Sequence, residues 1–310
     1  MENKTKKILI TGSSGTIGTR LFEKLLEQNY EVVGFDRKIN KWQPGLNKLA
    51  IKGDILLEED LLKIPKGIDL IIHLAANARV YDLVLKSELA KENILTVYNI
   101  LEFARKKNIK KIIFSSSREV YANRKKAVAK EENVNIDLCE SPYSASKIAG
   151  EALIRSYNKC YGINCVILRF SNVYGMYDES ERFVPLMIKK MIKNEKVEIF
   201  GENKLLDFTY IDDCADGIIK CVEKFGAAKN NVFNIASGRG EKLLRIAEAI
   251  KKRMGSRSKI FIKEARAGEV IKFAADISKA KKILGFCPKY SVEKGLDASI
   301  NWYSKEWKLS

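Results

Sequence analysis

A glycine-rich loop near the start of the chain is the feature that most limits its fold. An apolar stretch at 7–11 comes before the loop. An amphipathic stretch to about residue 28 and a second apolar stretch at 31–35 follow it. The loop reads Gly12-Ser13-Ser14-Gly15-Thr16-Ile17-Gly18, and the second apolar stretch ends in Asp36. This order of strand, glycine loop, helix, strand and acidic residue predicts a dinucleotide-binding unit.

Each part of this unit has a role in holding a dinucleotide. Glycines let the backbone close on a pyrophosphate, whose charge lies at the positive N-terminus of the helix. Asp36 can accept hydrogen bonds from the adenosine ribose and would repel a 2′-phosphate, so the sequence predicts NAD in preference to NADP. Arg37, the next residue, weakens this preference slightly.

Composition limits the alternatives. With 310 residues, of which 46% are hydrophobic and 31% charged, the chain predicts a globular protein with a full core. No stretch approaches the ~20 apolar residues of a membrane span and the start is lysine-rich, so we expect a cytoplasmic protein without a membrane partner. His73 is the only histidine and the six cysteines form no Cys-x-x-Cys pair, so we expect reduced cysteines and no metal site.

The formal net charge of +17 raises nucleic-acid binding as an alternative. The basic residues are spread along predicted helix faces and their ends, at 105–111, 251–263 and 279–282, without a nucleic-acid motif. We therefore interpret the charge as a solvated surface and expect no nucleic-acid partner.

A second pattern, at 115–147, carries candidate chemistry. Ser115, Ser116 and Ser117 directly follow an apolar stretch that predicts a buried strand. Further on, Ser141 and Pro142 are typical of a helix start.

That helix places Tyr143 and Lys147 four residues apart on one face. A cation one turn away favours the phenolate of a tyrosine. With a serine hydroxyl from the neighbouring strand, the three groups can move a proton on or off a sugar or alcohol oxygen. The Tyr-x-x-x-Lys spacing is also common on protein surfaces, so other motifs of the chain have to support a catalytic role for this pair.

The Gly-x-x-Gly-x-x-Gly loop and Tyr143-x-x-x-Lys147 together resemble the extended short-chain dehydrogenase/reductase superfamily, in its branch of NAD-dependent nucleotide-sugar epimerases and dehydratases. The resemblance runs essentially end to end. It implies an α/β fold, a Rossmann-type doubly wound parallel sheet with a smaller C-terminal substrate-binding lobe. Residues 1–170 would form the NAD-binding domain, with returns near 206–240. Residues 171–310 would be mainly the nucleotide-sugar-binding lobe, interleaved with the first.

The resemblance also assigns cofactor contacts. Asp54 and Ile55 match the turn that contacts adenine. Residues 68–76 predict a buried strand whose end, 74–76, resembles the wall against the cofactor, and Asn93 matches an asparagine that braces the active-site backbone. His73, beside that wall, is interpreted as structural. The expected cofactor-binding residues are Gly12, Gly15, Thr16, Ile17, Gly18, Asp36, Arg37, Asp54, Ile55, Leu74, Ala75, Ala76, Asn93, Ser115, Tyr143, Lys147 and Phe170.

For catalysis, the resemblance implies Tyr143 as the base and Lys147 as its electrostatic partner and ligand of the nicotinamide ribose. Ser117 is implied as the donor to the substrate oxygen, with Ser116 as the fallback. Ala122 stands where the family often has glycine, which suggests a different turn there.

Residues 118 and 119 distinguish reactions within the family. The 4,6-dehydratases carry an aspartate and a glutamate there, whereas this chain has Arg118 and Glu119. Dehydration is therefore disfavoured, while decarboxylation, which also uses the glutamate, stays open. Glu119 is a candidate catalytic residue, and a salt bridge to a neighbouring lysine is the alternative role.

Substrate contacts follow from the later motifs. Asn172 matches an asparagine that binds the diphosphate of the substrate. Leu206 stands where the family frequently has an arginine that binds the diphosphate, and Arg266 matches a second arginine of the family with the same role. Phe273 lies near a position that, in UDP-galactose 4-epimerases, determines whether an N-acetyl group on the sugar fits. A bulky residue there favours a plain hexose. The expected substrate-binding residues are Ser117, Tyr143, Asn172, Phe200, Arg266, Glu269 and Phe273. Asp212 and Asp213, before a predicted helix, are interpreted as helix caps rather than catalytic carboxylates.

The sequence thus predicts an NAD-dependent nucleotide-sugar epimerase, acting on C4 of a UDP-hexose through a 4-keto intermediate. The alternatives are a UDP-uronic acid decarboxylase, a nucleotide-sugar 4,6-dehydratase or reductase, and a non-catalytic NAD-binding sensor or nucleic-acid-associated protein. The helices predicted at 88–107 and 142–161 resemble the pair that forms the four-helix dimer interface of the family, so we expect a homodimer.

Overall fold

Parallel strands dominate the architecture of the protein. The structure is a computed structural model that describes residues 7–123, 128–266 and 270–307. In this part of the chain, seven strands form the main sheet in the order β11-β7-β5-β4-β1-β2-β3, and every neighbouring pair is parallel. These strands are β1 (Lys7–Thr11), β2 (Glu31–Asp36), β3 (Ala50–Lys52), β4 (Leu70–His73), β5 (Lys111–Ser117), β7 (Asn164–Phe170) and β11 (Asn231–Ile235). The predicted doubly wound parallel sheet is confirmed.

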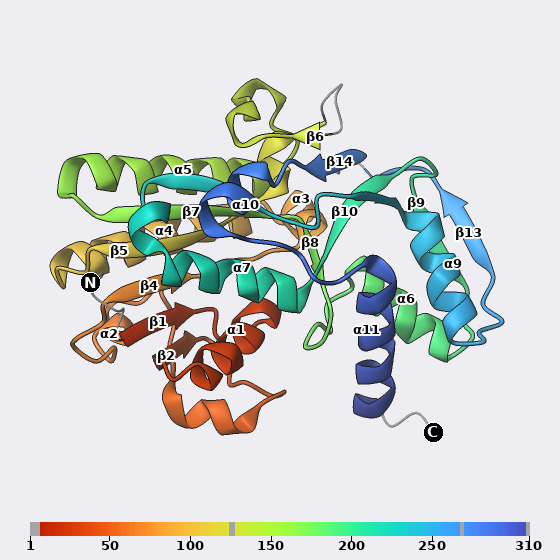
Figure 1. The fold of residues 1–310 in the computed structure, drawn as a ribbon, viewed down its shortest axis with the longest axis horizontal. Helices are drawn as coiled ribbons and strands as arrows, with labels where there is room; N and C mark the ends of the chain where they lie inside the picture. The colour runs from red at the N-terminus through yellow and green to blue at the C-terminus, as the bar shows by residue number, and fades with distance from the viewer. Residues whose placement is uncertain (1–6, 124–127, 267–269, 308–310) are drawn as a thin grey trace.

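Helices cover both faces of this sheet (Figure 1). Side chains alternate between the two faces along a strand. In β1, Ile8 and Ile10 join the apolar cluster with α1 (Thr16–Glu27) and α7 (Ile211–Glu223). Leu9 instead joins the cluster with α4 (Glu88–Lys106) and α5 (Pro142–Tyr161). The continuous apolar strands of the sequence are therefore explained by burial on both faces.

Smaller sheets and several helices follow along the chain, and α6, α9 and α11 lie beyond one end of the main sheet (Figure 1). The remaining strands are β6 (Val128–Ala129), β8 (Asn172–Tyr174), β9 (Val197–Phe200), β10 (Leu205–Tyr210), β12 (Gly240–Lys242), β13 (Ile260–Lys263) and β14 (Lys272–Ala275). The remaining helices are α2 (Glu58–Leu61), α3 (Val80–Leu85), α6 (Phe183–Ile192), α8 (Phe225–Ala228), α9 (Leu243–Arg253), α10 (Ser278–Leu284) and α11 (Val292–Glu306). Because β11 pairs with β7, the main sheet takes a strand from beyond residue 170. The division into 1–170 and 171–310 stays a prediction.

Local sequence signals fix the ends of α5. The side chain of Ser141 accepts a hydrogen bond from the backbone of Ser144 at 3.2 Å, and the Ser144 hydroxyl accepts one from the Ser141 backbone at 3.1 Å. Pro142 occupies the first turn, and Gly162 ends the helix with φ of 65°. The predicted start and end of this helix are confirmed.

Two local predictions were wrong. The buried strand expected at 68–76 is shorter, because β4 spans only Leu70–His73 and the chain then leaves the sheet at its edge. Asp212 and Asp213 do not cap α7, which begins earlier, at Ile211. Asp212 instead accepts a hydrogen bond from Arg20 at 2.5 Å, and Asp213 accepts from the backbone of Lys289 at 2.8 Å.

No helix in the described ranges combines the length and apolar character that crossing a membrane requires.

A strained turn follows the serine triplet. Ala122 has φ of 56° and ψ of −164°, a backbone conformation that favours glycine. Alanine thus occupies a backbone conformation that glycine adopts more readily, and a turn different from that of the family stays a prediction.

We predict that Ala122→Gly stabilises the protein by about 1 kcal/mol, because release of the backbone strain exceeds the entropy that glycine adds to the unfolded chain. Urea unfolding measures the change. As a control, Ala298→Gly, in the interior of α11, should destabilise by about 1 kcal/mol. Equal losses in both variants would show that Ala122 is unstrained.

Candidate active site

The predicted catalytic and cofactor residues meet at one edge of the main sheet. Because neighbouring strands are parallel, their carboxyl ends lie side by side. The glycine loop follows β1, residues 74–76 follow β4, and the serine triplet ends β5. Helix α5 packs on β5 and carries Tyr143 and Lys147 to the same edge.

The tyrosine and lysine are both buried in the first turns of α5. The Lys147 ammonium donates a hydrogen bond to the backbone oxygen of Ser115 at 2.9 Å. It lies 5.8 Å from the centre of the Tyr143 ring and 5.2 Å from that of Phe114. The end of β5 and the start of α5 therefore hold the two side chains in one arrangement.

Burial sets the protonation of both groups. Burial raises the pKa of Tyr143, and the nearby Ser117 side chain and the charge of Arg182 offset part of that rise. Burial lowers the pKa of Lys147 to about 8. The sequence interpretation that the lysine would bring the tyrosine pKa below its ordinary value does not hold in this structure, because desolvation outweighs the neighbouring charges.

The structure separates the two candidate serines. Ser116 donates to the Glu151 carboxylate at 2.6 Å, and Glu151 in turn forms a buried ion pair with Arg169 at 2.7 Å. Ser117 instead accepts a hydrogen bond from the backbone of Glu119 at 3.2 Å and lies near enough to Tyr143 to lower the pKa of its phenol. This arrangement favours Ser117 over Ser116 as the group that faces a substrate oxygen.

The glycine loop fits a dinucleotide. A Cβ at Gly12 would lie 2.7 Å from the Ala75 nitrogen, and one at Gly18 would lie 2.1 Å from the Gly12 oxygen. Only glycine therefore allows the loop, the helix and the end of β4 to approach so closely. No described side chain caps α1, whose N-cap is Gly15, so its first N–H groups can bind a pyrophosphate.

The acid after β2 is held in place by the backbone. The Asp36 carboxylate accepts hydrogen bonds from the N–H groups of Ser14 and Lys38, both at 2.9 Å. A carboxylate oxygen accepts more than one hydrogen bond, so Asp36 can still accept from a ribose. Arg37 lies 3.9 Å from Asp54, which brings the two residues predicted at the adenosine end close together.

Two other predicted residues have bracing roles. Asn93 accepts from the backbone nitrogen of Asn77 at 2.7 Å and donates to its backbone oxygen at 3.0 Å. His73 is fully buried with Nδ1 2.7 Å from the Thr11 hydroxyl, and burial lowers its pKa to about 3. A histidine that stays neutral in the core agrees with a structural role.

The other predicted cofactor residues lie around this edge. The Thr16 hydroxyl donates to the backbone oxygen of Tyr177 at 3.1 Å, so it also links the glycine loop to the segment after β8. Ile17 and residues 74–76 are half-buried. Ile55 and Phe170 are buried, and Phe170 is the last residue of β7.

Part of the predicted substrate set also gathers. The Arg266 guanidinium stacks over the Phe200 ring at 3.8 Å and over the Tyr81 ring at 5.0 Å. Tyr81 was missed in the sequence, where nothing distinguished it from other helix residues. The Asn172 side chain donates to the backbone oxygen of Asp207 at 2.9 Å, which ties β8 to β10.

The Phe273 side chain is buried and does not border an open space that could admit an N-acetyl group. Its ring is 2% exposed, stacks on Tyr121 with the centres 5.8 Å apart, and is covered by the Arg118 guanidinium at 5.7 Å. Glu269 lies outside the described residues.

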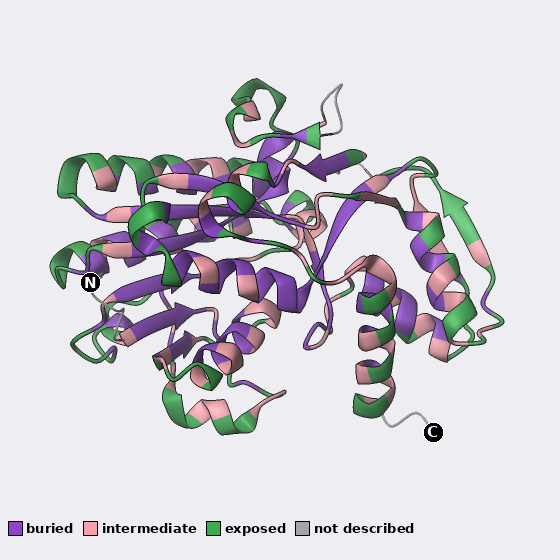
Figure 2. Ribbon diagram, in the orientation of Figure 1, coloured by how far each residue is buried: buried purple, intermediate pink, exposed green. Residues whose placement is uncertain are grey.

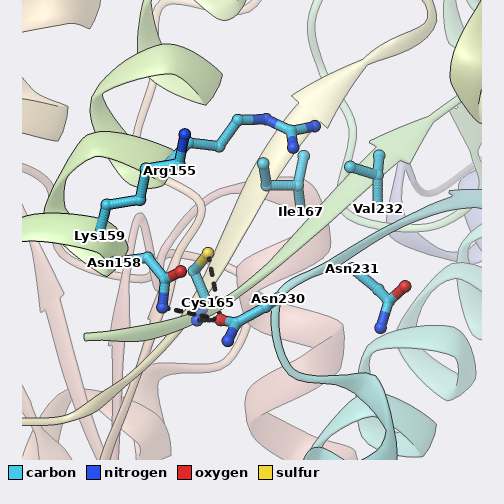
Figure 3. Close-up of a pocket in the computed structure, with 8 residues that line it drawn as sticks. All are labelled: Arg155, Asn158, Lys159, Cys165, Ile167, Asn230, Asn231 and Val232. Atoms are coloured by element: carbon cyan, nitrogen blue, oxygen red, sulfur yellow. Dashed lines mark hydrogen bonds between the residues drawn. The ribbon is translucent and has the colours of Figure 1, made fainter. Parts of the chain in front are cut away.

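A hollow at the opposite end of the sheet is unrelated to this site (Figure 3). Its volume is about 150 Å³, and it lies where β7 and β11 begin, beside α5. The Asn230 side chain accepts hydrogen bonds there from the Asn158 side chain and the Cys165 nitrogen, both at 3.0 Å. These amides pair with each other, so we interpret the hollow as structural. Its lining residues are Arg155, Asn158, Lys159, Cys165, Ile167, Asn230, Asn231 and Val232.

Comparison with known proteins decides the family. The model of the NAD dependent epimerase/dehydratase family matches residues 8–236. The chain belongs to this family. Its cofactor is NAD, as predicted, and the resemblance to the extended short-chain dehydrogenase/reductases is confirmed.

Individual relatives cover the whole chain. A putative UDP-glucose 4-epimerase of Methanocaldococcus jannaschii is 34% identical over an alignment of 303 positions, which covers 95% of this chain and 97% of that protein. The crystal structure of UDP-glucose 4-epimerase with UDP-glucose from Thermotoga maritima aligns with a TM-score of 0.89 and 32% identity, over 97% of this chain and 99% of that one. The UDP-glucuronic acid 4-epimerase of Bacillus cereus, in complex with UDP-glucuronic acid and NAD, aligns with a TM-score of 0.89 and 31% identity, over the same shares.

The buried lysine predicts a pH dependence of stability. The pKa of Lys147 is about 8 in the folded protein and near its ordinary 10.5 when unfolded, so the unfolded chain binds more protons between these values. The free energy of unfolding of the wild type, relative to Lys147→Met, should therefore rise by about 3 kcal/mol as the pH increases from 8 to 10.5.

Urea unfolding of the NAD-free proteins at several pH values measures this difference. Lys159→Met, which removes an exposed lysine of the same helix, serves as the control. A difference between wild type and Lys147→Met that does not change with pH would contradict the lowered pKa.

Proposed function

We propose that the protein is an NAD-dependent nucleotide-sugar 4-epimerase that acts on a UDP-hexose. The observation that carries the proposal is the cluster of Ser117, Tyr143 and Lys147 beside a glycine loop that fits NAD. The relatives named as UDP-sugar 4-epimerases, which align over nearly the whole chain, support this reaction within the family.

The chain's own residues supply the proton chemistry. Ser117 donates to the C4 oxygen of the sugar, and Tyr143 takes the proton of the C4 hydroxyl as that carbon is oxidised to a ketone. When bound, NAD would supply reversible hydride transfer at C4, so the sugar would undergo no net oxidation. Lys147, bound to the Ser115 backbone, places a cation 5.8 Å from the centre of the Tyr143 ring, and we assign it also to a hydroxyl of the nicotinamide ribose.

The cofactor residues have separate tasks in this proposal. Gly12, Gly15 and Gly18, with the first N–H groups of α1, hold the pyrophosphate. Asp36 accepts hydrogen bonds from the adenosine ribose. On the substrate side, we assign the diphosphate to Arg266 and Asn172.

The alternatives find less support. Arg118 forms an ion pair with Glu119 at 2.7 Å, so the carboxylate expected to act in a dehydratase or decarboxylase is partly neutralised. A non-catalytic NAD sensor has no need of a buried serine, tyrosine and lysine gathered at one edge of the sheet. We keep decarboxylation of a UDP-uronic acid as the second candidate.

We also propose that the protein forms a homodimer through α4 and α5, which pack against each other. Apolar side chains remain exposed on these helices, with Leu95 39%, Tyr98 45% and Tyr161 46% exposed. Figure 2 shows exposed and half-buried positions along α5. A second pair of the same helices would cover them in a four-helix bundle.

Proton NMR with a panel of nucleotide sugars in D₂O, without added cofactor, tests the proposed reaction. We expect inversion at C4 without deuterium uptake from the solvent. Tyr143→Phe should retain NAD and lose at least about 10²-fold in turnover, because it lacks the proton acceptor. Deuterium at C5, or loss of C6 as carbon dioxide, would instead indicate the dehydratase or decarboxylase reaction.

A further inference from the structure

Arg118 is a buried cation at the edge of the candidate site. It directly follows Ser117 and begins the short helix η2 (Arg118–Tyr121) at the carboxyl end of β5. The residue is 8% exposed. One nitrogen, Nη2, contacts a Glu119 oxygen at 2.7 Å, and the guanidinium lies over the Phe273 ring.

The second terminal nitrogen of this side chain lacks a hydrogen-bond partner among the described residues. Arg118 Nη1 is buried and makes no hydrogen bond within the described part of the chain. Arginine carries five N–H donors and stays charged, so it cannot remove the demand for an acceptor by losing a proton. A buried donor without an acceptor is rare and costly in a folded protein. An acceptor on the substrate is therefore the expected partner.

The charges nearby favour an anionic acceptor. The charges of Arg118, Arg182 and Glu119 all act on the pKa of Tyr143, so two cations and one anion lie near enough to influence the proposed base. Arg182 is paired with Asp178 only at 3.6 Å, beyond hydrogen-bond distance. A guanidinium binds a carboxylate through charge-assisted hydrogen bonds about twice as strong as those to a neutral hydroxyl.

We infer that Arg118 binds a carboxylate on the sugar and that the substrate is a UDP-hexuronate. In a hexuronic acid, the carbon next to C4 bears a carboxylate, whereas in a plain hexose it bears a hydroxymethyl group. Ser117 contacts the oxygen on C4, and Arg118 is the adjacent residue. This inference rests on the proposed function. It replaces the sequence expectation of a plain hexose, which came from Phe273, a ring now found buried beneath Arg118.

Binding measurements on an inactive background test the inference. Calorimetry on NAD-loaded Tyr143→Phe compares UDP-glucuronate with UDP-glucose, and we expect UDP-glucuronate to bind at least about tenfold more tightly. Adding Arg118→Met with Glu119→Gln removes both members of the ion pair, which avoids leaving the glutamate buried alone. This change should abolish the preference.

Two further variants complete the design. Arg118→Lys keeps the charge but loses the planar guanidinium, so it should reduce the preference for UDP-glucuronate without abolishing it. This single variant replaces the double variant in the test if the double variant does not fold. Arg155→Met, at the hollow on the other side of the protein (Figure 3), should keep the full preference. Equal binding of both sugars on the Tyr143→Phe background, or a preference that survives the loss of Arg118, would overturn the inference.

Turnover by the wild type separates this inference from the proposed function. Conversion of UDP-glucuronate to UDP-galacturonate supports both. Conversion of UDP-glucose to UDP-galactose, with no activity on UDP-glucuronate, supports the function and overturns the role of Arg118. Release of carbon dioxide from UDP-glucuronate overturns the 4-epimerase and supports the binding of a carboxylate.

Discussion

The parallel pairing of β1, β4, β5 and β7 is the constraint on which the site depends. Parallel strands end together, so the glycine loop, the segment after β4 and the serine triplet reach one edge although they are up to about 100 residues apart in the chain. Antiparallel pairing of β5 would send its serines to the opposite edge. The catalytic arrangement is therefore a consequence of strand direction, and α5 adds the tyrosine and lysine to it.

Buried polar groups then fix the side chains at this edge. Glu151 receives hydrogen bonds from both Ser116 and Arg169, and Lys147 donates to the backbone of Ser115. Burying any of these polar groups without a partner would cost free energy, whereas the hydrogen bonds and the ion pair offset that cost. Few other conformations of the end of β5 would keep all of these partners together. Ser117 directly follows Ser115 and Ser116, so these anchors also fix its backbone at the end of β5.

The sequence predicted most of the fold because its signals are local. The ends of α5 depend on Ser141, Pro142 and Gly162, and the glycine loop has few alternative conformations. Predictions failed where tertiary partners decide. Asp212 resembled a cap but pairs with Arg20, nearly 200 residues away in the chain. The raised pKa of Tyr143 and the unpartnered nitrogen of Arg118 follow from burial, which spacing along the chain does not reveal.

The central claim is that the sugar is oxidised and reduced at C4 by one enzyme-bound NAD, with Tyr143 carrying the proton. The most direct test uses a UDP-sugar labelled with deuterium at C4, incubated in ordinary water without added cofactor, with the product examined by NMR. The account predicts that the C4 epimer keeps its deuterium at C4, because the hydride returns to the carbon that it left. Loss of the label from C4 of the epimerised product would contradict it.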